Sequence, residues 1–408
     1  MMRSLYSGVS GLKGHQTRMD VIGNNIANVN TTGFKSSRTT FADTLSQTVS
    51  GASTPSDNIG GTNPKQIGLG MGIASIDTIF TNGSVQATGK NTDLCLSGNG
   101  LFVVKQGSQV YYTRDGAFEF DANGNYVLPG SGHLVQGWMA KDGELPASRT
   151  DANMDKITIA ADTSIPPSVT TQATYAGNID AGSANSTAIT TTLPVYDTQG
   201  YQTKVPIIFT KTGTNTWSLS SSASNVSFST TSITFDGNGN LIGPTTGQTT
   251  ITMTVSSGAN TPVTVATDIS GITQYNAEST VHSSKSDGYS EGKLESISID
   301  SSGVVTGVYT NGVRRTEAQV AVAQFSNAAG LTKTGNSFYQ ESNNSGKAHV
   351  GEASALGVTI TPSALEMSNV DIANEFSDMI VTQRGFQSNS KIITVSDEML
   401  ETMINMKR

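Results

Sequence analysis

The sequence predicts a multi-domain α+β protein, in which a helix at each end of the chain encloses two mainly antiparallel β-domains, one nested within the other. Three observations predict this fold class. Apolar residues follow helical spacing only near the two ends of the chain. Between the ends they alternate with a period of two, and turn sequences recur about every ten residues. Charged residues make up only 14% of the chain, so Ser, Thr, Asn and Gly must supply much of its solubility.

The first element is an amphipathic helix expected over residues 5–29. A subset of its apolar residues repeats every seven residues, as in a coiled coil. This subset is Leu5, Leu12, Met19 and Ile26, with Val9 at an alternate position of the seam. The glycines at positions 8, 11, 14 and 23 each weaken such a helix by up to ~1 kcal/mol relative to Ala. A helix this poor in good helix formers needs packing partners to stay folded.

An asparagine-rich stretch, NNIANVNTTGFK (residues 24–35), follows this helix. Asn25 and Asn28 offer donors and acceptors near a helix C-terminus, where the last four carbonyls lack partners. Gly33 can adopt the positive φ that a sharp turn requires. We expect Phe34 to act as an apolar anchor and Lys35 to pair with a neighbouring carboxylate. An ordinary helix end without an interface role is the alternative.

The middle of the chain is expected to contain a connector and two β-domains. Residues 36–75 are rich in Ser, Thr, Gly, Asn and Pro, which predicts an extended connector, and short strands are expected from about residue 76. An inner β-domain is predicted over residues 76–144 and 285–363. Residues 145–284 are poorest in charge and richest in Ser and Thr, and are predicted to form an outer β-domain inserted into the inner one.

A repeated local pattern supports antiparallel hairpins in both β-domains. An apolar strand is followed by Asp, a short polar turn, Gly and a second strand, as in FEFDANGNYVL and ITFDGNGNLIG. The Asn-Gly pairs at 123–124 and 238–239 fit two-residue hairpin turns. The nesting of the domains places both ends of the chain at the same end of the molecule.

The last element is a long helix within residues 364–408, which together with residues 1–35 make up a terminal helical domain. Five apolar residues keep a strict seven-residue period: Ile372, Met379, Phe386, Ile393 and Leu400. Phe376 and Ile404 are placed on the same seam, and Ser368 with Asp371 is expected to form a capping box. A second apolar stripe lies about a quarter-turn away and consists of Ile392, Val395, Met399, Met403 and Met406.

The two terminal helices are expected to pair with each other. Such a pair buries one side of each helix, so the second stripe still needs neighbours. Because no other helix of this length is predicted in the chain, we expect those neighbours to be other copies of the same protein.

Sites for catalysis, cofactors or metals are not predicted. The sequence contains no phosphate-binding glycine loop and no His-Glu-x-x-His. Asp121, Asn123 and Asn125 resemble the start of a calcium loop, but the glycine and glutamate that complete one are missing, so a hairpin turn is expected. The single cysteine, Cys95, is expected to be a small residue within a strand, and a covalent role between subunits stays open.

Charge and hydropathy exclude further classes of partner. The net charge is −8 and no basic run is present, which argues against a nucleic-acid partner. The sequence has no run of ~20 apolar residues, so a membrane span is not predicted. The composition is typical of surface-exposed proteins, yet the first residues do not resemble a cleavable secretory signal.

Two blocks at opposite ends of the chain resemble the bacterial flagellar rod and hook proteins. The first is MDVIGNNIANVNTTGFK (19–35), where Asn25, Asn28, Thr31, Gly33, Phe34 and Lys35 match the family pattern. The second spans residues 364–408, and Gly385-Phe386 departs slightly from its pattern. Its matching residues are Leu365, Glu366, Ser368, Asn369, Val370, Asp371, Glu375, Met379, Ile380, Gln383, Arg384, Gln387, Asn389 and Asp397. Segments 98–104, 112–121 and 320–339 resemble the inner β-domain of the family.

The resemblance implies a structural subunit of a tube that links a rotary motor to a filament. The length near 400 residues and the inserted β-domain favour a hook subunit, with a distal rod component as the alternative. It further implies a homopolymer that meets rod, hook-cap and hook–filament junction proteins, is extracellular, and is exported without a cleavable signal peptide. The residues expected at the contacts between subunits are Leu5, Val9, Leu12, Met19, Asn25, Ile26, Asn28, Gly33, Phe34, Lys35, Ile372, Phe376, Met379, Phe386, Ile393, Met399, Leu400, Met403 and Ile404.

Two other classes of function remain as alternatives. An adhesin-like or surface-layer β-protein would explain the middle rich in Ser and Thr but not the seven-residue repeat from Ile372 to Leu400. An enzyme would require a charged cleft that the sequence does not indicate.

Overall fold

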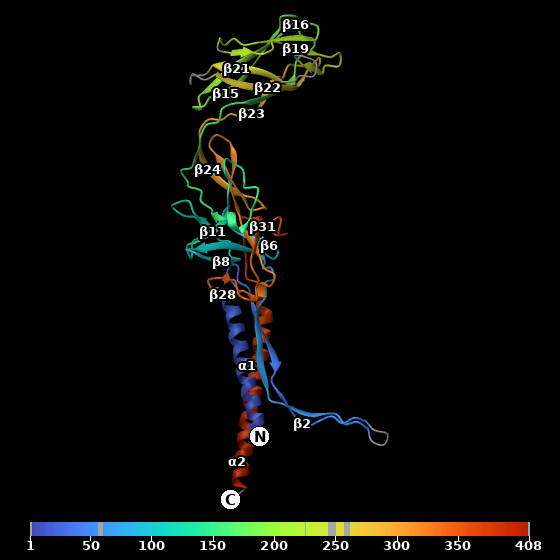
Figure 1. Cartoon of the computed structure of the whole chain (residues 1–408), viewed down its shortest axis with the longest axis vertical. Helices are drawn as coiled ribbons and strands as arrows, with labels where there is room; N and C mark the ends of the chain where they lie inside the picture. Colours follow the sequence, from blue (N-terminus) through green and yellow to red (C-terminus); the bar gives the residue numbers. More distant parts are fainter. Residues whose placement is uncertain (1, 56–59, 225, 244–249, 257–261, 407–408) are drawn as a thin grey trace. The chain divides into compact units, whose positions relative to one another are not determined.

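The computed structural model describes residues 2–55, 60–224, 226–243, 250–256 and 262–406. The chain divides into two compact units, one of Met1–Ala160, Ser298–Thr306 and Thr316–Arg408, the other of Ala161–Ile297 and Gly307–Arg315. Long terminal helices and mainly antiparallel sheets confirm the predicted α+β class (Figure 1). The predicted domain limits at residues 144/145 and 284/285 differ from the limits of these two units and remain a proposal.

The first unit contains both terminal helices, α1 (Met2–Ala27) and α2 (Ile372–Asn405). Its first strands are β1 (Ser37–Asp43), β2 (Ser46–Ser50), β3 (Lys65–Gly68), β4 (Met71–Thr78), β5 (Val85–Ala87), β6 (Leu94–Ser97), β7 (Leu101–Gln106), β8 (Gln109–Thr113), β9 (Glu119–Phe120), β10 (Tyr126–Leu128), β11 (His133–Met139) and β12 (Asp155–Lys156). Its later strands are β27 (Val322–Gln324), β28 (Thr332–Gly335), β29 (Phe338–Gln340), β30 (His349–Gly351), β31 (Thr359–Pro362) and β32 (Ala364–Glu366). Short 3-10 helices occupy Asp151–Asn153 and Ala328–Gly330.

The inner sheet of this unit is antiparallel. Strand β7 pairs with β8 and β11, and β8 pairs with β29. Its core includes Leu101, Val103, Tyr112, Trp138, Ala321, Ala323, Phe325, Leu331 and Tyr339. Strands β5 and β6 pair with β32 and β31, so the segment just before α2 is held by the segment that follows the β1–β4 hairpin.

Strands begin earlier than the sequence predicts. Residues 36–75 contain most of two hairpins, β1 with β4 and β2 with β3. The side chains of β2 and β3 are all exposed, which explains why no apolar alternation marks these strands in the sequence. The connector is therefore extended, as expected, but its backbone is hydrogen-bonded as β-structure.

The second unit is a sandwich of two sheets that share one apolar core. Among the described residues each sheet has five strands, in the orders β18-β21-β22-β14-β23 and β15-β16-β17-β19-β20. The first contains β14 (Gln172–Asn178), β18 (Val226–Phe228), β21 (Thr250–Ser256), β22 (Pro262–Thr273) and β23 (His282–Ser286). The second contains β15 (Ala188–Tyr196), β16 (Gln202–Gly213), β17 (Thr216–Ser220), β19 (Ser232–Phe235) and β20 (Leu241–Gly243). Tyr175, Phe209 and Trp217 are buried between them.

The remaining strands are short or cross the division of the chain. Strand β13 is Ser164–Ile165, and β24 (Gly292–Ile299), β25 (Val304–Tyr309) and β26 (Arg314–Val320) each cross a boundary between the units. The predicted hairpin turn at Asp121 is present, since its carboxylate accepts hydrogen bonds from the backbone N–H groups of Asn123 and Asn125, both at 2.8 Å.

Helix α2 begins at a different cap from the expected one. The Asp371 side chain accepts hydrogen bonds from the N–H groups of Ala373 and Asn374 and is the N-cap, whereas Ser368 bonds to Val370 before the helix starts. Aspartate is as effective as serine at this position because its oxygen satisfies otherwise unpaired N–H groups. Helix α1 ends at Ala27, two residues before the predicted end. The basic residues 407 and 408, whose charge suits the negative C-terminal end of a helix, lie outside the described residues.

Candidate functional site

Helices α1 and α2 lie side by side and antiparallel (Figure 1). Near the β-structure, Asn25 donates a hydrogen bond to Glu375 at 2.9 Å, and Arg18 forms a 3.1 Å ion pair with Asp378. Farther along, Gly385 faces the His15 ring and Gly11 faces the Asn389 side chain. The expected pairing of the terminal helices is confirmed.

Small residues determine how closely the helices approach. A Cβ atom at Gly11 would lie 2.7 Å from the Asn389 amide nitrogen, and one at Gly385 would lie 2.7 Å from the His15 ring. Gly8 and Gly11, which weaken α1 as an isolated helix, thus provide room for the side chains of α2, whereas Gly14 faces Met71 and Phe41. Burial, followed by the nearby charge of Arg18, lowers the pKa of His15.

The seam of α2 toward α1 differs in part from the predicted one. Met379, Ile393 and Leu400 are half-buried as expected, but the alternate positions that are buried are Thr382 and Ser396. Four residues that the sequence pattern places on the seam are exposed: Ile372, Phe376, Phe386 and Ile404. An apolar pattern does not reveal a seam made from Thr, Ser, Gly and Asn, and this is why the prediction is wrong at the alternate positions.

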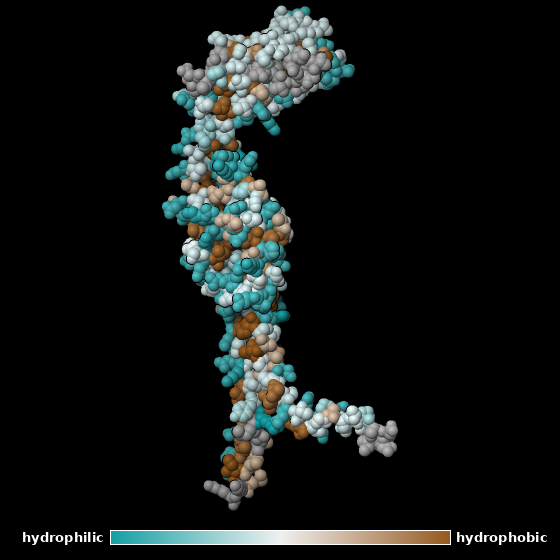
Figure 2. Space-filling view, viewed as in Figure 1, coloured by the Kyte–Doolittle hydropathy of each residue, from teal (hydrophilic) through white to brown (hydrophobic). Residues whose placement is uncertain are grey.

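The helix pair leaves many large apolar side chains in contact with solvent, and Figure 2 shows apolar surface along the helices. Among the predicted contact residues of α1 and the turn after it, Val9 is exposed, and the half-buried ones are Leu5, Leu12, Met19, Ile26 and Asn28. On α2 the exposed apolar residues are Ile372, Phe376, Ile380, Val381, Phe386, Ile392, Val395, Met399, Met403, Ile404 and Met406. Both predicted stripes of α2 therefore remain largely uncovered by its own chain.

Asn25 joins three segments where the helices meet the β-structure. Its side-chain nitrogen donates to the Ser37 carbonyl at 2.8 Å as well as to Glu375, and its oxygen accepts from the Ser37 N–H at 3.0 Å. Burial raises the pKa of Glu375, while the bond from Asn25 opposes that shift. Asn28 donates to the Asn24 carbonyl at 2.9 Å, which satisfies one of the terminal carbonyls of the helix. The asparagine cluster thus links the end of α1 to both β1 and α2.

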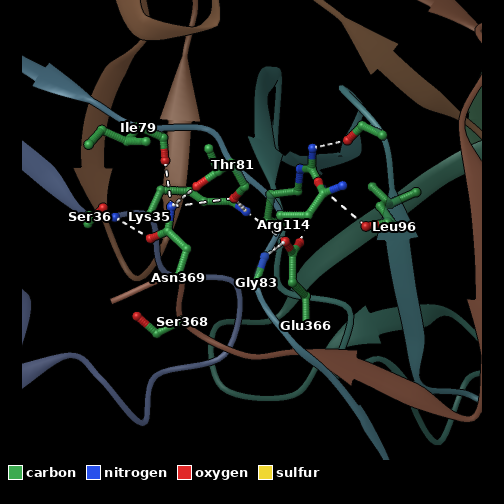
Figure 3. Close-up of polar contacts among 12 residues, drawn as sticks. Lys35, Ser36, Ile79, Thr81, Gly83, Leu96, Arg114, Glu366, Ser368 and Asn369 are labelled. Atoms are coloured by element: carbon green, nitrogen blue, oxygen red, sulfur yellow. Dashed lines mark hydrogen bonds and ion pairs between the residues drawn. The ribbon is translucent and has the colours of Figure 1, made fainter. Parts of the chain in front are cut away.

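A buried ion network, shown in Figure 3, holds the segment that leads into α2. Glu366 accepts from Lys35 at 2.6 Å and from Arg114 at 3.1 Å, and all three side chains are at most 1% exposed. The Gly83 N–H donates to the same carboxylate at 2.8 Å, and Lys35 also donates to the Thr81 carbonyl at 2.7 Å. Burial lowers the pKa of Lys35, and the adjacent Glu366 carboxylate opposes this effect.

Asn369 completes this junction from the other side of the same segment. Its oxygen accepts from the Ser36 N–H at 2.7 Å, and its nitrogen donates to the Ile79 carbonyl at 2.8 Å. The expected pairing of Lys35 with a carboxylate is confirmed. The partners Arg114 and Asn369 are not among the predicted site residues, although both lie within segments that resemble the rod and hook family.

Gly33 lies in the turn between α1 and Lys35 and has φ of 64°, as its predicted role requires. A Cβ atom there would lie 2.4 Å from the Asp115 nitrogen and 2.6 Å from the Arg114 carbonyl carbon. The centre of the Phe34 ring lies 5.0 Å from the ammonium nitrogen of Lys333. Phe34 also lines a groove of about 560 Å³ together with Asn28 and Phe338. The turn is therefore packed directly against the inner sheet.

Other kinds of site are not found in the described part of the chain. No group of three or more His, Cys, Asp or Glu residues there is placed to hold a metal ion. Of the described helices, none is both long and apolar enough to cross a membrane. Cys95 is buried in β6, and burial, with a smaller effect of Glu366, raises its pKa to about 11, so the thiol is protonated at neutral pH.

Models of known families match four segments of the chain. Residues 5–35 match "Flagella basal body rod protein", and residues 361–406 match "Flagellar basal body rod FlgEFG protein C-terminal". Residues 95–174 match "Flagellar hook protein FlgE/F/G D1 domain", and residues 160–289 match "Flagellar basal body protein FlaE D2 domain".

Curated relatives match over the full length of the chain. The flagellar hook protein FlgE of Borreliella burgdorferi is 40% identical, and that of Treponema pallidum is 41% identical, with 100% of each chain covered. This chain belongs to the flagellar rod and hook protein family. A further family member, the basal-body rod protein FlgG of Bacillus subtilis, is 32% identical with 100% of both chains covered.

A solved structure shares the fold of this rod and hook family member. The flagellar hook protein FlgE2 of Helicobacter pylori matches with a TM-score of 0.51 and 14% identity, covering 69% of this chain and 100% of the other. At this identity the likeness concerns the fold alone.

Proposed function

We propose that this chain is a structural subunit of the bacterial flagellar hook, which polymerises into a flexible tube and transmits motor torque to the filament. The observation that carries the proposal is the apolar surface that α1 and α2 leave exposed, including Phe376, Met403 and Ile404. Burial of apolar surface contributes roughly 25 cal/mol per Å², so these stripes favour association with other copies. The relatives named hook proteins, matched over the whole chain, support this role.

The helices would transmit torque, and the β-structure would allow the tube to bend. Helices packed through apolar stripes form an inner layer that resists twisting, because each subunit shares its contacts with several neighbours. The β-structure is low in charge and rich in Ser and Thr. Between subunits it would form smaller, more hydrated contacts, which can slide past one another at a small cost in free energy. The buried network around Glu366 would transmit force from the helices to the inner sheet, because its ion pairs hold the segment before α2 firmly in place.

The proposal includes a location and a set of partners. We infer a role outside the cell and contacts with rod, hook-cap and hook–filament junction proteins. The predicted contact residues of the two helices, the first of which is Leu5 and the last Ile404, are proposed to lie between subunits, together with Asn28 and Phe34. Asn25, Gly33 and Lys35 are buried within the chain and are proposed to position the turn instead. A structural role, rather than an enzymatic one, accords with the use of the buried charges in holding segments together.

A distal rod component is the second candidate function. The full-length relative from Bacillus subtilis, named a rod protein, favours it. An adhesin-like or surface-layer protein is a weaker candidate because it gives no role to the exposed stripes of α2.

Electron microscopy of the purified chain, concentrated until it assembles, tests the proposal. We expect tubes that bend, and a gain in helical circular dichroism on assembly as α1 and α2 acquire partners. Straight, stiff tubes would instead favour the rod component. A chain that stays monomeric at every concentration, or that forms flat sheets, would contradict both flagellar functions.

A further inference from the structure

The end of α2 extends past the described end of α1. Facing residues of the antiparallel pair, such as Gly11 with Asn389 and His15 with Gly385, have numbers that add to 400. Met2 therefore lies level with about residue 398, and the last turns of α2 continue beyond it (Figure 1). Met403 and Ile404 in these turns are 52% and 68% exposed.

Acidic side chains accompany the apolar ones at this end of α2. Asp397, Glu401 and Ile404 follow one another at spacings of four and three residues, which places them on one face of the helix. Asp397 and Glu401 are exposed and form no ion pair within the described residues. We call Asp397, Glu401 and Ile404 the acidic stripe.

The outward face of α1 has the opposite charge as far as Lys13, and Asp20 lies farther along the same face. Tyr6, Val9 and Lys13 lie at spacings of three and four residues, and Arg3 lies one turn earlier. Tyr6 is 66% exposed, and Arg3 and Lys13 are exposed with no ion pair to another described residue. We call Arg3, Tyr6, Val9 and Lys13 the basic stripe; it faces away from α2, because Gly8 and Gly11 occupy the contact side.

We propose that the acidic stripe of one copy docks on the basic stripe of the next copy. This inference rests on the proposed function and identifies the surfaces through which the copies meet. Each stripe pairs apolar residues with charges of one sign, and the two signs are complementary. Two acidic stripes would repel each other, which argues against a symmetric contact between two α2 ends. A contact between different surfaces on identical subunits builds an open helical assembly when its rotation does not close into a ring, and this is the kind of assembly that the proposed function requires.

Charge reversal on each side tests the contact. The basic-side variant carries R3E and K13E, and the acidic-side variant carries D397K and E401K. The readout is the concentration of unassembled chain at steady state, measured by sedimentation. We expect either variant alone to raise this concentration about tenfold or more, because two attractive pairs become repulsive at every contact. We expect an equimolar mixture of the two variants to assemble almost as well as the unmodified chain.

Mixing separates contacts between copies from contacts within one chain. In the mixture, Glu side chains of one copy meet Lys side chains of another, whereas a pair within a chain would stay repulsive. K285E with K293E, at exposed lysines of the second unit, produces the same net charge change as the basic-side variant and is expected to leave assembly unchanged.

Three results would overturn the inference while the unmodified chain forms tubes. The reversed variants could each assemble like the unmodified chain. The mixture could fail where a chain carrying all four substitutions succeeds, which would place the pairing within a chain. The acidic-side variant alone could assemble normally while the basic-side variant fails, which would assign another surface to the α2 end. Failure of the unmodified chain to assemble would instead refute the proposed function, and this inference with it.

Discussion

Replacing Glu366 by Gln is expected to lower the free energy of unfolding of the first unit by about 3–5 kcal/mol, because the substitution leaves two buried cations without a counter-charge. Lys35 and Arg114 are at most 1% exposed, so water cannot replace the lost carboxylate. The measurement is denaturant unfolding followed by Trp138 fluorescence. Trp138 is fully buried in the first unit, and the other tryptophan, Trp217, is removed by W217F in all samples.

An exposed ion pair in the same unit supplies the matched control. Lys90 and Glu119 lie 3.2 Å apart, with their side chains 46% and 53% exposed. Glu119→Gln removes one charge from this pair and is expected to cost at most about 1 kcal/mol. Equal losses for Glu366→Gln and Glu119→Gln would show that the buried network does not hold the unit together.

Replacing Gly33 by Ala is expected to cost on the order of 3 kcal/mol or more and to disturb the path from α1 into β1. The φ of 64° disfavours any L side chain, and the added Cβ would collide with the backbone at Asp115, which cannot rotate away. The same fluorescence experiment measures the loss, and helical circular dichroism reports whether α1 still forms.

A substitution at Gly107 separates the two causes of that loss, which are the backbone strain at positive φ and the collision of the added Cβ. Its φ is 62°, but apart from its chain neighbours no atom lies within 4 Å of the position that an added Cβ would occupy. Gly107→Ala therefore adds backbone strain without a collision, and this control is expected to cost about 1–2 kcal/mol. If Gly33→Ala costs no more than Gly107→Ala, the close packing of the turn against the inner sheet contributes nothing to stability.

Features that depend on local pattern could be predicted from the sequence. The seven-residue repeat beginning at Ile372 predicts α2, because an apolar period sustained over this length is diagnostic of a helix. The φ of Gly33 follows from the need for a sharp turn, and a carboxylate partner for Lys35 follows from the cost of burying a lone charge.

Features that depend on distant partners could not be predicted in the same way. Nothing in the spacing of Lys35, Arg114 and Glu366 shows that they meet, because the chain between them must fold first. The hairpins of residues 36–75 expose the side chains of β2 and β3, so no alternation marks those strands. The seam between the helices uses Gly11 and Gly385, which an apolar pattern overlooks.

Hydrogen exchange along α2, compared between the monomer and the assembled form, tests the central claim most directly: other copies cover the stripes that the chain leaves exposed. We predict that backbone amides of residues 376–404 exchange at least about tenfold more slowly after assembly, since burial by neighbours suppresses local opening. Amides of β7, whose first four residues are already buried in the first unit, should change little and serve as the internal reference. Equal protection of α2 in both states would contradict the claim, because the helices would then be satisfied within a single chain.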